Sequence, residues 1–291
     1  MKTHIVKCDF PEEKVGLRTF RNQKNSILHT HEFDEIAFVI KGSAIHEIGG
    51  NRYPIMRGDV FVIHGNQVHK ISNTNNLTIL NIIYEKEFFE KIKEEYKDTP
   101  GFSALFIHEP LFREKQKFNA FLQLSSRQFQ NIEDLLTIID KEQVERETGF
   151  KEIIASVFVQ TILTLCRYYH KTDSFKSKGM LKISAAINYI ENNFSKNITI
   201  AKLCEITELP ETTFRRTFKK ITGSLPIDYL VHIRIEKAAE MMREKPGLHV
   251  VDVCISSGFE NTGYFSRKFK KIIGVTPIQY LKKQRGIGKW A

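Results

Sequence analysis

The larger apolar side chains alternate along the N-terminal part of the chain, which predicts β-strands. Ile36, Phe38 and Ile40 alternate with the smaller Ala37 and Val39, and short apolar runs follow over 60–63 and 78–84. Glycine and asparagine residues separate these runs as turns. Short strands with turn residues at this spacing are typical of a β-sandwich or barrel.

From about Lys86 the pattern becomes helical, with a less regular stretch over 99–119 for which we predict no element. Two segments then carry an apolar residue every three or four positions, as amphipathic helices do. Their stripes are Ile132, Leu135, Leu136 and Ile139, and Ile153, Ile154, Val157, Phe158, Ile162 and Leu165. Such a stripe packs within its own domain, which is the default expectation, or pairs with a second copy of the chain.

Residues 170–179 are polar, rich in Ser and Lys and without periodicity, which predicts a linker. We therefore expect domains over 1–169 and 180–291, the second one helical; a length of 291 residues allows two domains. Met1 to Gly16 lack the apolar core of a signal peptide, and the longest apolar runs are too short to cross a bilayer. The four cysteines show neither paired nor metal-type spacing, so we expect reduced thiols in a cytoplasmic protein.

The positive charge is concentrated in the second domain. The formal net charge is +10; residues 1–178 hold 25 Lys and Arg against 24 Asp and Glu, whereas residues 179–291 hold 19 against 10. A basic domain beside a neutral one indicates that one half meets a polyanion such as nucleic acid. A solvated basic surface that serves solubility would give the same charge, so charge alone does not decide between the two.

The basic domain contains an internal repeat. The segment 214–221 (FRRTFKKI) reappears over 265–272 (FSRKFKKI), shifted by 51 positions. The match continues from Gly223, Pro226 and 229–230 to their counterparts Gly274, Pro277 and 280–281. So many identities in one register predict two copies of one structural unit.

Each copy predicts a helix-turn-helix. A short helix over 200–207 or 250–256 precedes a turn, and a second helix opens near Pro210 or Asn261, residues that suit a helix start. Two Phe four positions apart turn each second helix inward and leave its central Arg outward. A long helix over 226–244 would hold the two units at a fixed separation, as two adjacent major-groove segments about 34 Å apart require.

Residues 250–277, with GFE over 258–260, YFSR over 264–267 and GVTP over 274–277, closely resemble the second unit of AraC/XylS transcription regulators. The resemblance covers roughly residues 180–283. It implies base contacts from the exposed faces of both recognition helices, at Thr212, Arg215, Arg216, Thr262, Gly263 and Arg267. Gly263 stands where many members carry a larger polar side chain. The cationic residues that follow suit phosphates, although ordinary solvated charges are an equal alternative for them: Lys219, Lys220, Lys270 and Lys271.

A histidine pattern in the first domain resembles the two cupin motifs. The first comprises His29, His31, Glu35 and Gly42; the second comprises Gly58, His64, Asn66, His69 and Asn73, where His64 replaces the usual Pro and Asn66 the usual Gly. The resemblance implies a jelly-roll barrel, and His29, His31, Glu35 and His69 match the metal ligands of cupin enzymes. In AraC-type regulators such a barrel usually binds a small effector, and its histidines then act as hydrogen-bonding groups without a metal. Histidines that only complete the barrel wall are a further alternative.

Residues 29–33, 57–64 and 81–84 also resemble the activators of L-rhamnose catabolism. The resemblance implies a sugar effector, whose hydroxyl groups need several donors and acceptors in a concave site. Six residues could supply them: His29, His31, Glu35, His46, His69 and Asn81.

The sequence therefore predicts an α+β two-domain regulator. A cupin-like effector barrel with a helical dimerisation segment precedes an all-α DNA-binding domain with two helix-turn-helix units. We expect a homodimeric activator, not an enzyme, that binds double-stranded DNA, RNA polymerase and a small molecule and needs no cofactor. A metal-dependent cupin enzyme fused to a DNA-targeting module, and an architectural DNA binder without effector, are the alternatives.

Overall fold

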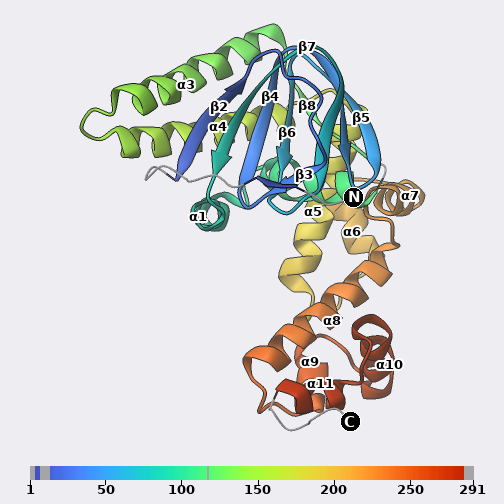
Figure 1. Cartoon of the computed structure of the whole chain (residues 1–291). Helices are drawn as coiled ribbons and strands as arrows, with labels where there is room; N and C mark the ends of the chain where they lie inside the picture. Colours follow the sequence, from blue (N-terminus) through green and yellow to red (C-terminus); the bar gives the residue numbers. More distant parts are fainter. Residues whose placement is uncertain (1–3, 7–13, 117, 285–291) are drawn as a thin grey trace. The chain divides into compact units, whose positions relative to one another are not determined.

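The computed structural model describes residues 4–6, 14–116 and 118–284 and confirms the α+β two-domain fold class (Figure 1). The chain divides into two compact units, residues 1–181 and 182–291, and the boundary falls within helix α5 (Phe175–Asn193). The helix begins four residues before the end of the predicted linker, so only 171–174 lie between it and the preceding helix. None of the described helices is long and apolar enough to cross a membrane.

The first unit is built on one eight-stranded sheet with the order β1-β3-β7-β4-β6-β8, in which β2 also pairs with β7 and β5 with β4. Strands β4 and β7 are the long central pair, and their register shifts between Val39 and Ile45 bend the sheet. The strands are β1 (His4–Val6), β2 (Val15–Phe20), β3 (His29–His31), β4 (Asp34–Ile48), β5 (Asn51–Met56), β6 (Asp59–Ile63), β7 (His69–Tyr84) and β8 (Leu122–Gln123).

The bend has a local cause in Gly42. This residue has a φ of 78°, and a Cβ placed on it would lie 2.3 Å from the carbonyl oxygens of Asn75 and Asn76. Only glycine allows β4 and β7 to approach so closely here. Apolar side chains of the curved sheet, among them Val39, Phe61 and Ile79, form a buried core.

The stretch over 99–119, for which the sequence predicts no element, contains two helical segments. Helix α1 (Lys86–Tyr96) is followed by a π-helix, η1 (Ser103–His108), which continues into α2 (Glu109–Lys115). Phe102, Leu105, Phe106 and Phe112 are all buried. Because the segment is enclosed on most sides and changes its helical period, it lacks the polar stripe that reveals an amphipathic helix.

The two amphipathic segments form an antiparallel pair, α3 (Ser126–Glu145) and α4 (Phe150–His170), which pack on each other and on β2. Ser125 and Gln128 close the start of α3 with a capping box. Most residues of the apolar stripes, such as Ile132, Ile139 and Phe158, are buried within this unit, whereas Leu135 is half-buried and Ile153 is exposed. The default expectation therefore holds for most of the two stripes, with Leu135 and Ile153 as the exceptions.

The second unit is helical, and its repeat is visible in its geometry. Its further helices are α6 (Ile200–Thr207), α7 (Glu211–Thr222), α8 (Pro226–Glu244), α9 (Val250–Ser256), α10 (Thr262–Ile273) and α11 (Pro277–Gln284). The ring centroids of Phe214 and Phe218 lie 5.5 Å apart, and those of Phe265 and Phe269 lie 5.6 Å apart. In both copies a glycine with positive φ ends the second helix, Gly223 at 79° and Gly274 at 90°.

Helix α8 belongs to both helix-turn-helix cores. Near its start, the ring of Tyr229 lies 5.5 Å from that of Phe218 in the first copy. Further along, Ile235 and Met242 are fully buried in one cluster with Phe269 of the second copy. One rigid helix therefore connects the two helix-turn-helix copies within the second unit, which fixes how far apart α7 and α10 lie.

Three of the four cysteines lie in described residues and are free thiols. Cys166 and Cys254 are buried and Cys204 is half-buried, whereas Cys8 lies outside the described residues.

Candidate effector cavity and DNA-binding surface

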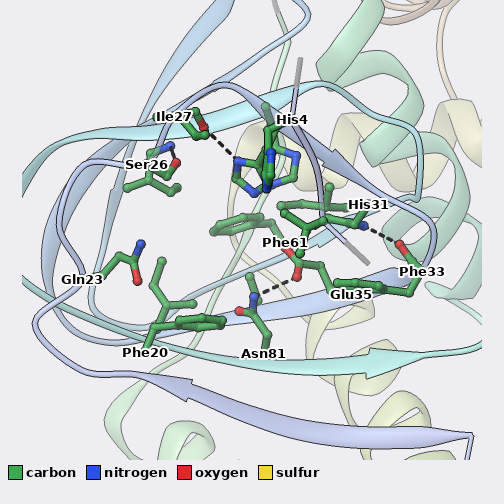
Figure 2. Close-up of a pocket in the computed structure, with 17 residues that line it drawn as sticks. His4, Phe20, Gln23, Ser26, Ile27, His31, Phe33, Glu35, Phe61 and Asn81 are labelled. Atoms are coloured by element: carbon green, nitrogen blue, oxygen red, sulfur yellow. Dashed lines mark hydrogen bonds and ion pairs between the residues drawn. The ribbon is translucent and has the colours of Figure 1, made fainter. Parts of the chain in front are cut away.

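A cavity of about 350 Å³ lies in the curved sheet of the first unit (Figure 2). Its wall comes from β1, β2, β3, β4, β6 and β7 and from the segments that join β2 to β3 and β3 to β4. Apolar side chains such as Phe20, Ile27, Phe61 and Ile79 make up much of the lining. The polar lining residues are His4, Gln23, Ser26, His29, His31, Glu35, His69 and Asn81. A largely apolar hollow with a few convergent polar groups is the usual form of a small-molecule site.

Three cavity histidines are held in the same way. The Nδ1 atoms of His29, His31 and His69 lie 2.9, 2.5 and 3.0 Å from the main-chain oxygens of Ile27, Phe33 and Gln67. Strand pairing sets His29 directly opposite His69, and their ring centroids are 4.3 Å apart. The ring of His31 lies 5.2 Å from that of His69. The structure thus gathers these three predicted residues into one cluster.

Glu35 and Asn81 complete the polar wall. The Asn81 side-chain amide donates to Glu35 Oε2 over 2.8 Å, and the other carboxylate oxygen lies 3.7 Å from His31 Nε2 (Figure 2). Burial disfavours charge on both Glu35 and His31, but their mutual attraction outweighs it. The pKa of Glu35 is therefore lowered and that of His31 raised. Burial lowers the pKa of His69 to about 4, so this imidazole is neutral at physiological pH.

Three of these side chains could hold a metal ion. His31, Glu35 and His69 each offer one ligand atom, and the three atoms lie within 4.8 Å of one another. His29, the fourth residue of the predicted metal set, is not in this group.

His46 is not among the residues that line the cavity, although the sequence suggests it for effector binding. It is fully buried behind the lining, with its ring stacked 5.0 Å from that of Phe61. Burial, and then the positive charge of Arg113, lower its pKa well below the ordinary value. Its face could not be read from β4, because the register shifts before it change the alternation of inward and outward residues.

Several residues near the cavity were not singled out by the sequence. His4, Gln23 and Ser26 belong to a short edge strand and an irregular segment, which carry no periodic signal. A fully buried ion pair, Glu109 and Arg113, lies behind Phe61, with the guanidinium carbon 5.3 Å from its ring. The i,i+4 spacing of this pair could have indicated it, but the same spacing is common on exposed helices.

The candidate DNA-binding residues lie on the outer faces of α7 and α10. Those that are exposed are Thr212, Arg216, Lys219, Lys220, Thr262, Gly263, Arg267, Lys270 and Lys271. The Phe residues of both helices are fully buried beneath them. The opposite faces of each helix therefore separate folding residues from those available to a ligand.

Arg215 differs from its neighbour Arg216. It is only half-buried, and its Nε donates to Glu211 Oε1 over 2.7 Å on the same helix face. At the corresponding position α10 carries Ser266. The two recognition helices therefore share one exposed outward arginine each, Arg216 and Arg267, and differ at their other outward positions.

Comparison with known proteins assigns both units. Residues 17–149 match the AraC-like ligand binding domain, and residues 203–283 match a helix-turn-helix domain. The HTH-type transcriptional activator RhaR of Enterobacter sp. (strain 638) is 27% identical over 258 residues, which cover 88% of this chain and 87% of the relative. The protein of the same name from Salmonella dublin is 27% identical over 253 residues, or 87% and 86% of the two chains.

Two solved structures are also similar to this chain, with low TM-scores. The apo form of a ToxT variant from Vibrio cholerae strain SCE256 is 16% identical with a TM-score of 0.38, covering 92% of this chain and 97% of that one. The C-terminal domain of AraT, a response regulator from Geobacillus stearothermophilus, is 31% identical with a TM-score of 0.33, covering 35% and 84%. The two domain matches and the length of the alignment to the relatives agree: this chain belongs to the AraC family of transcription regulators, with a ligand-binding domain before a helix-turn-helix DNA-binding domain.

Proposed function

We propose that this regulator is a transcription activator controlled by a sugar that binds in the cavity of the first unit. The observation that carries the proposal is the mixed lining of the cavity. His29, His31, Glu35, His69 and Asn81 form one cluster of polar groups, His4, Gln23 and Ser26 add others, and apolar side chains make up the rest of the wall. A sugar presents hydroxyl groups along its edge and C–H groups on its ring face, so it suits both kinds of wall.

The relatives support the sign of regulation, and the resemblance to activators of L-rhamnose catabolism supports the sugar. The related proteins are named transcriptional activators RhaR, which fits an activator whose effector is L-rhamnose or a similar sugar. We propose His29, His31, Glu35, His69 and Asn81 as its hydrogen-bonding partners and leave out His46, which does not reach the cavity.

For DNA, we propose that Arg216 and Arg267 read base edges and that the lysines after them bind phosphates. Arginine pairs with guanine through two hydrogen bonds, whereas lysine contributes affinity with little sequence information. Thr212, Arg215, Thr262 and Gly263 belong to the same proposed surface. In this proposal Arg215 must leave Glu211 before it can contact a base.

Regulation follows from linkage between the two sites. An effector that binds one arrangement of a homodimer more tightly shifts the population toward that arrangement, and with it DNA occupancy or the contact with RNA polymerase. We place the protein in the cytoplasm, where its DNA lies.

The test is the thermal stability of the full chain with a panel of sugars, L-rhamnose included. A sugar at a hundredfold excess over its dissociation constant should stabilise the domain that binds it by about 2.7 kcal/mol. Arg216→Ala is the control, since it lies outside the cavity and should keep the shift. No shift with any sugar would sink the sugar assignment; turnover of a small molecule in place of simple binding would favour the enzyme alternative.

A further inference from the structure

Three histidines of the cavity have their Nε2 lone pair available for a metal ion. A main-chain oxygen only accepts hydrogen bonds, so the Nδ1 atoms that lie against such oxygens in His29, His31 and His69 carry the proton. In the neutral ring the lone pair is then on Nε2. Histidines that ligate metals are held by their other nitrogen in the same way, which fixes tautomer and ring orientation.

One of these Nε2 atoms is buried and has no hydrogen-bond partner among the described residues. His31 is 2% exposed, and its Nε2 makes no hydrogen bond to any residue that the structure describes. The nearest acidic oxygen, Glu35 Oε1, is 3.7 Å away, beyond hydrogen-bond reach. Two ligands about 2.1 Å from one ion lie roughly 3.4 Å apart in tetrahedral geometry. The distance between His31 and Glu35 is therefore closer to that of two ligands on one ion than to that of an ion pair in contact.

The carboxylate has its own support. Asn81 donates to Glu35 Oε2 and leaves Oε1 on the side of His31. Hydrogen bonds of this kind orient ligating carboxylates in metal sites. With His69, the set offers two imidazoles and one carboxylate within 4.8 Å of one another, so small side-chain rotations would bring all three atoms onto one ion.

We propose that His31, His69 and Glu35 bind a divalent first-row transition metal ion at the floor of the effector cavity. Imidazole nitrogens with one carboxylate suit Zn, Ni, Co, Fe or Mn and do not suit Ca or Mg, which prefer oxygen ligands alone. Three protein ligands leave coordination positions open toward the cavity, beside His29. The ion is thus placed to bind oxygen atoms of the effector, in place of the direct hydrogen bonds proposed above for His31, Glu35 and His69. This last step rests on the proposed function; metal binding itself does not.

The first experiment measures metal binding by the untagged full chain. After equilibration with Zn²⁺ and removal of the excess, we expect an equimolar amount of zinc by elemental analysis, and with Co²⁺ a visible ligand-field spectrum. His69→Gln and Glu35→Gln should lose both signals. Glu35→Gln keeps an oxygen for Asn81, so it tests the charge of the ligand with little change in shape.

A matched control is available in α8. His232 and Glu236 form an exposed i,i+4 pair with 3.2 Å between nitrogen and oxygen, the same spacing in sequence as His31 and Glu35. His232→Gln should retain the metal. Loss of the signal in this control, or a wild-type chain that takes up neither ion, would overturn the proposal. If the His69 variant does not fold, Asn81→Ala serves in its place, with an affinity for zinc about 10–100-fold weaker.

The second experiment separates this inference from the proposed function. The sugar panel is repeated after chelation and again after Zn²⁺ is restored. A sugar shift that disappears with the metal and returns with it supports both. A sugar shift that survives in a chain free of metal overturns the contact between the ion and the effector and leaves the sugar function intact. Equimolar metal without any sugar shift supports the metal site and contradicts the proposed sugar effector.

Discussion

In the sheet unit the side chains proposed for ligand binding are almost all buried, whereas in the helical unit those proposed for DNA contact are exposed, apart from the half-buried Arg215. His31, Glu35 and His69 are each less than 10% exposed, while Arg216 and Arg267 lie on the outer faces of their helices. A small effector can be enclosed, so its site uses groups whose pKa values and orientations depend on burial. A DNA duplex is too large to enclose, so its site uses charges that remain in solvent.

The largest effect we expect is the destabilisation of the helical unit alone by a core substitution. Phe269→Ala removes a fully buried ring from the core shared with α8, and such substitutions cost about 3–5 kcal/mol. DNA binding should be lost, while the response of the sheet unit to its ligand remains. Hydrogen exchange over α10 and over β4 measures both effects, with Phe218→Ala as the matched change in the first copy. Faster exchange in β4 as well would show that the two units do not fold independently.

The second prediction concerns protons in the sheet unit. His108 in η1 is 2% exposed, and burial lowers its pKa to about 4 from the ordinary 6.5. The folded state therefore binds the proton less well than the unfolded state. The resulting stability is present above pH 6.5 and is lost as the pH falls toward 4, by up to about 3 kcal/mol.

His108→Phe keeps a ring of similar size and removes this titration. Its stability should fall less than that of the wild type between pH 7 and pH 4, as measured by hydrogen exchange over β4 or by chemical denaturation at each pH. The exposed His232→Gln is the control. Identical acid dependence in the wild type and in His108→Phe would assign the loss to other groups.

The same contrast explains what the sequence could predict. In the helical unit, Phe214 and Phe218 recur as Phe265 and Phe269, and helical geometry then places the intervening arginine outside. Local spacing was enough to predict which residues are exposed, because each repeat folds over a short segment and the residues proposed to contact DNA are on the face opposite to its core. The predicted bounds of α6, α8 and α9 agree with the structure for this reason.

In the sheet unit local spacing was not enough. His29 and His69 meet only because β3 pairs with β7 across forty positions of sequence. His46 lies behind the lining, with its ring against those of Phe61 and His69, and the register shifts in β4 mean that alternation along the strand could not show this. The segment that contains His108 showed no periodicity, since it is buried and partly π-helical. Long-range pairing, a bend and a fully buried helix leave no trace in a short sequence window.

The third prediction separates the two kinds of exposed charge. Arg216→Ala should cost about 1–3 kcal/mol for its cognate base pair and little for other bases at that position. Lys219→Ala should weaken binding to all sequences alike and reduce the salt dependence by about one counterion. Binding to a randomised site library at two salt concentrations measures both. An equal loss over all sequences in Arg216→Ala would make this arginine a phosphate contact.

The smallest effect we expect concerns the helix starts. Asn261 caps α10, since its side chain accepts from the Tyr264 N–H over 2.8 Å, whereas Pro210 at the start of α7 makes no such bond. The first helix of each helix-turn-helix shows the opposite. Thr199 caps α6 through its hydroxyl, and His249 gives α9 no side-chain cap. Each helix-turn-helix therefore has one capped helix.

Asn261→Ala should cost about 1 kcal/mol, because one N–H group at the start of α10 loses its acceptor. Thr199→Ala should cost a similar amount at the start of α6, in the first helix-turn-helix copy. Asn261 lies at the N-terminal end of α10, the end from which a recognition helix approaches bases, so Asn261→Ala should also weaken DNA binding. Thr199 lies outside both recognition helices. Thr199→Ala should therefore leave the DNA affinity of the folded protein nearly unchanged. Denaturation together with DNA titration distinguishes the two. Equal losses of DNA affinity in both variants would mean that stability alone, and not the local order of α10, sets the affinity.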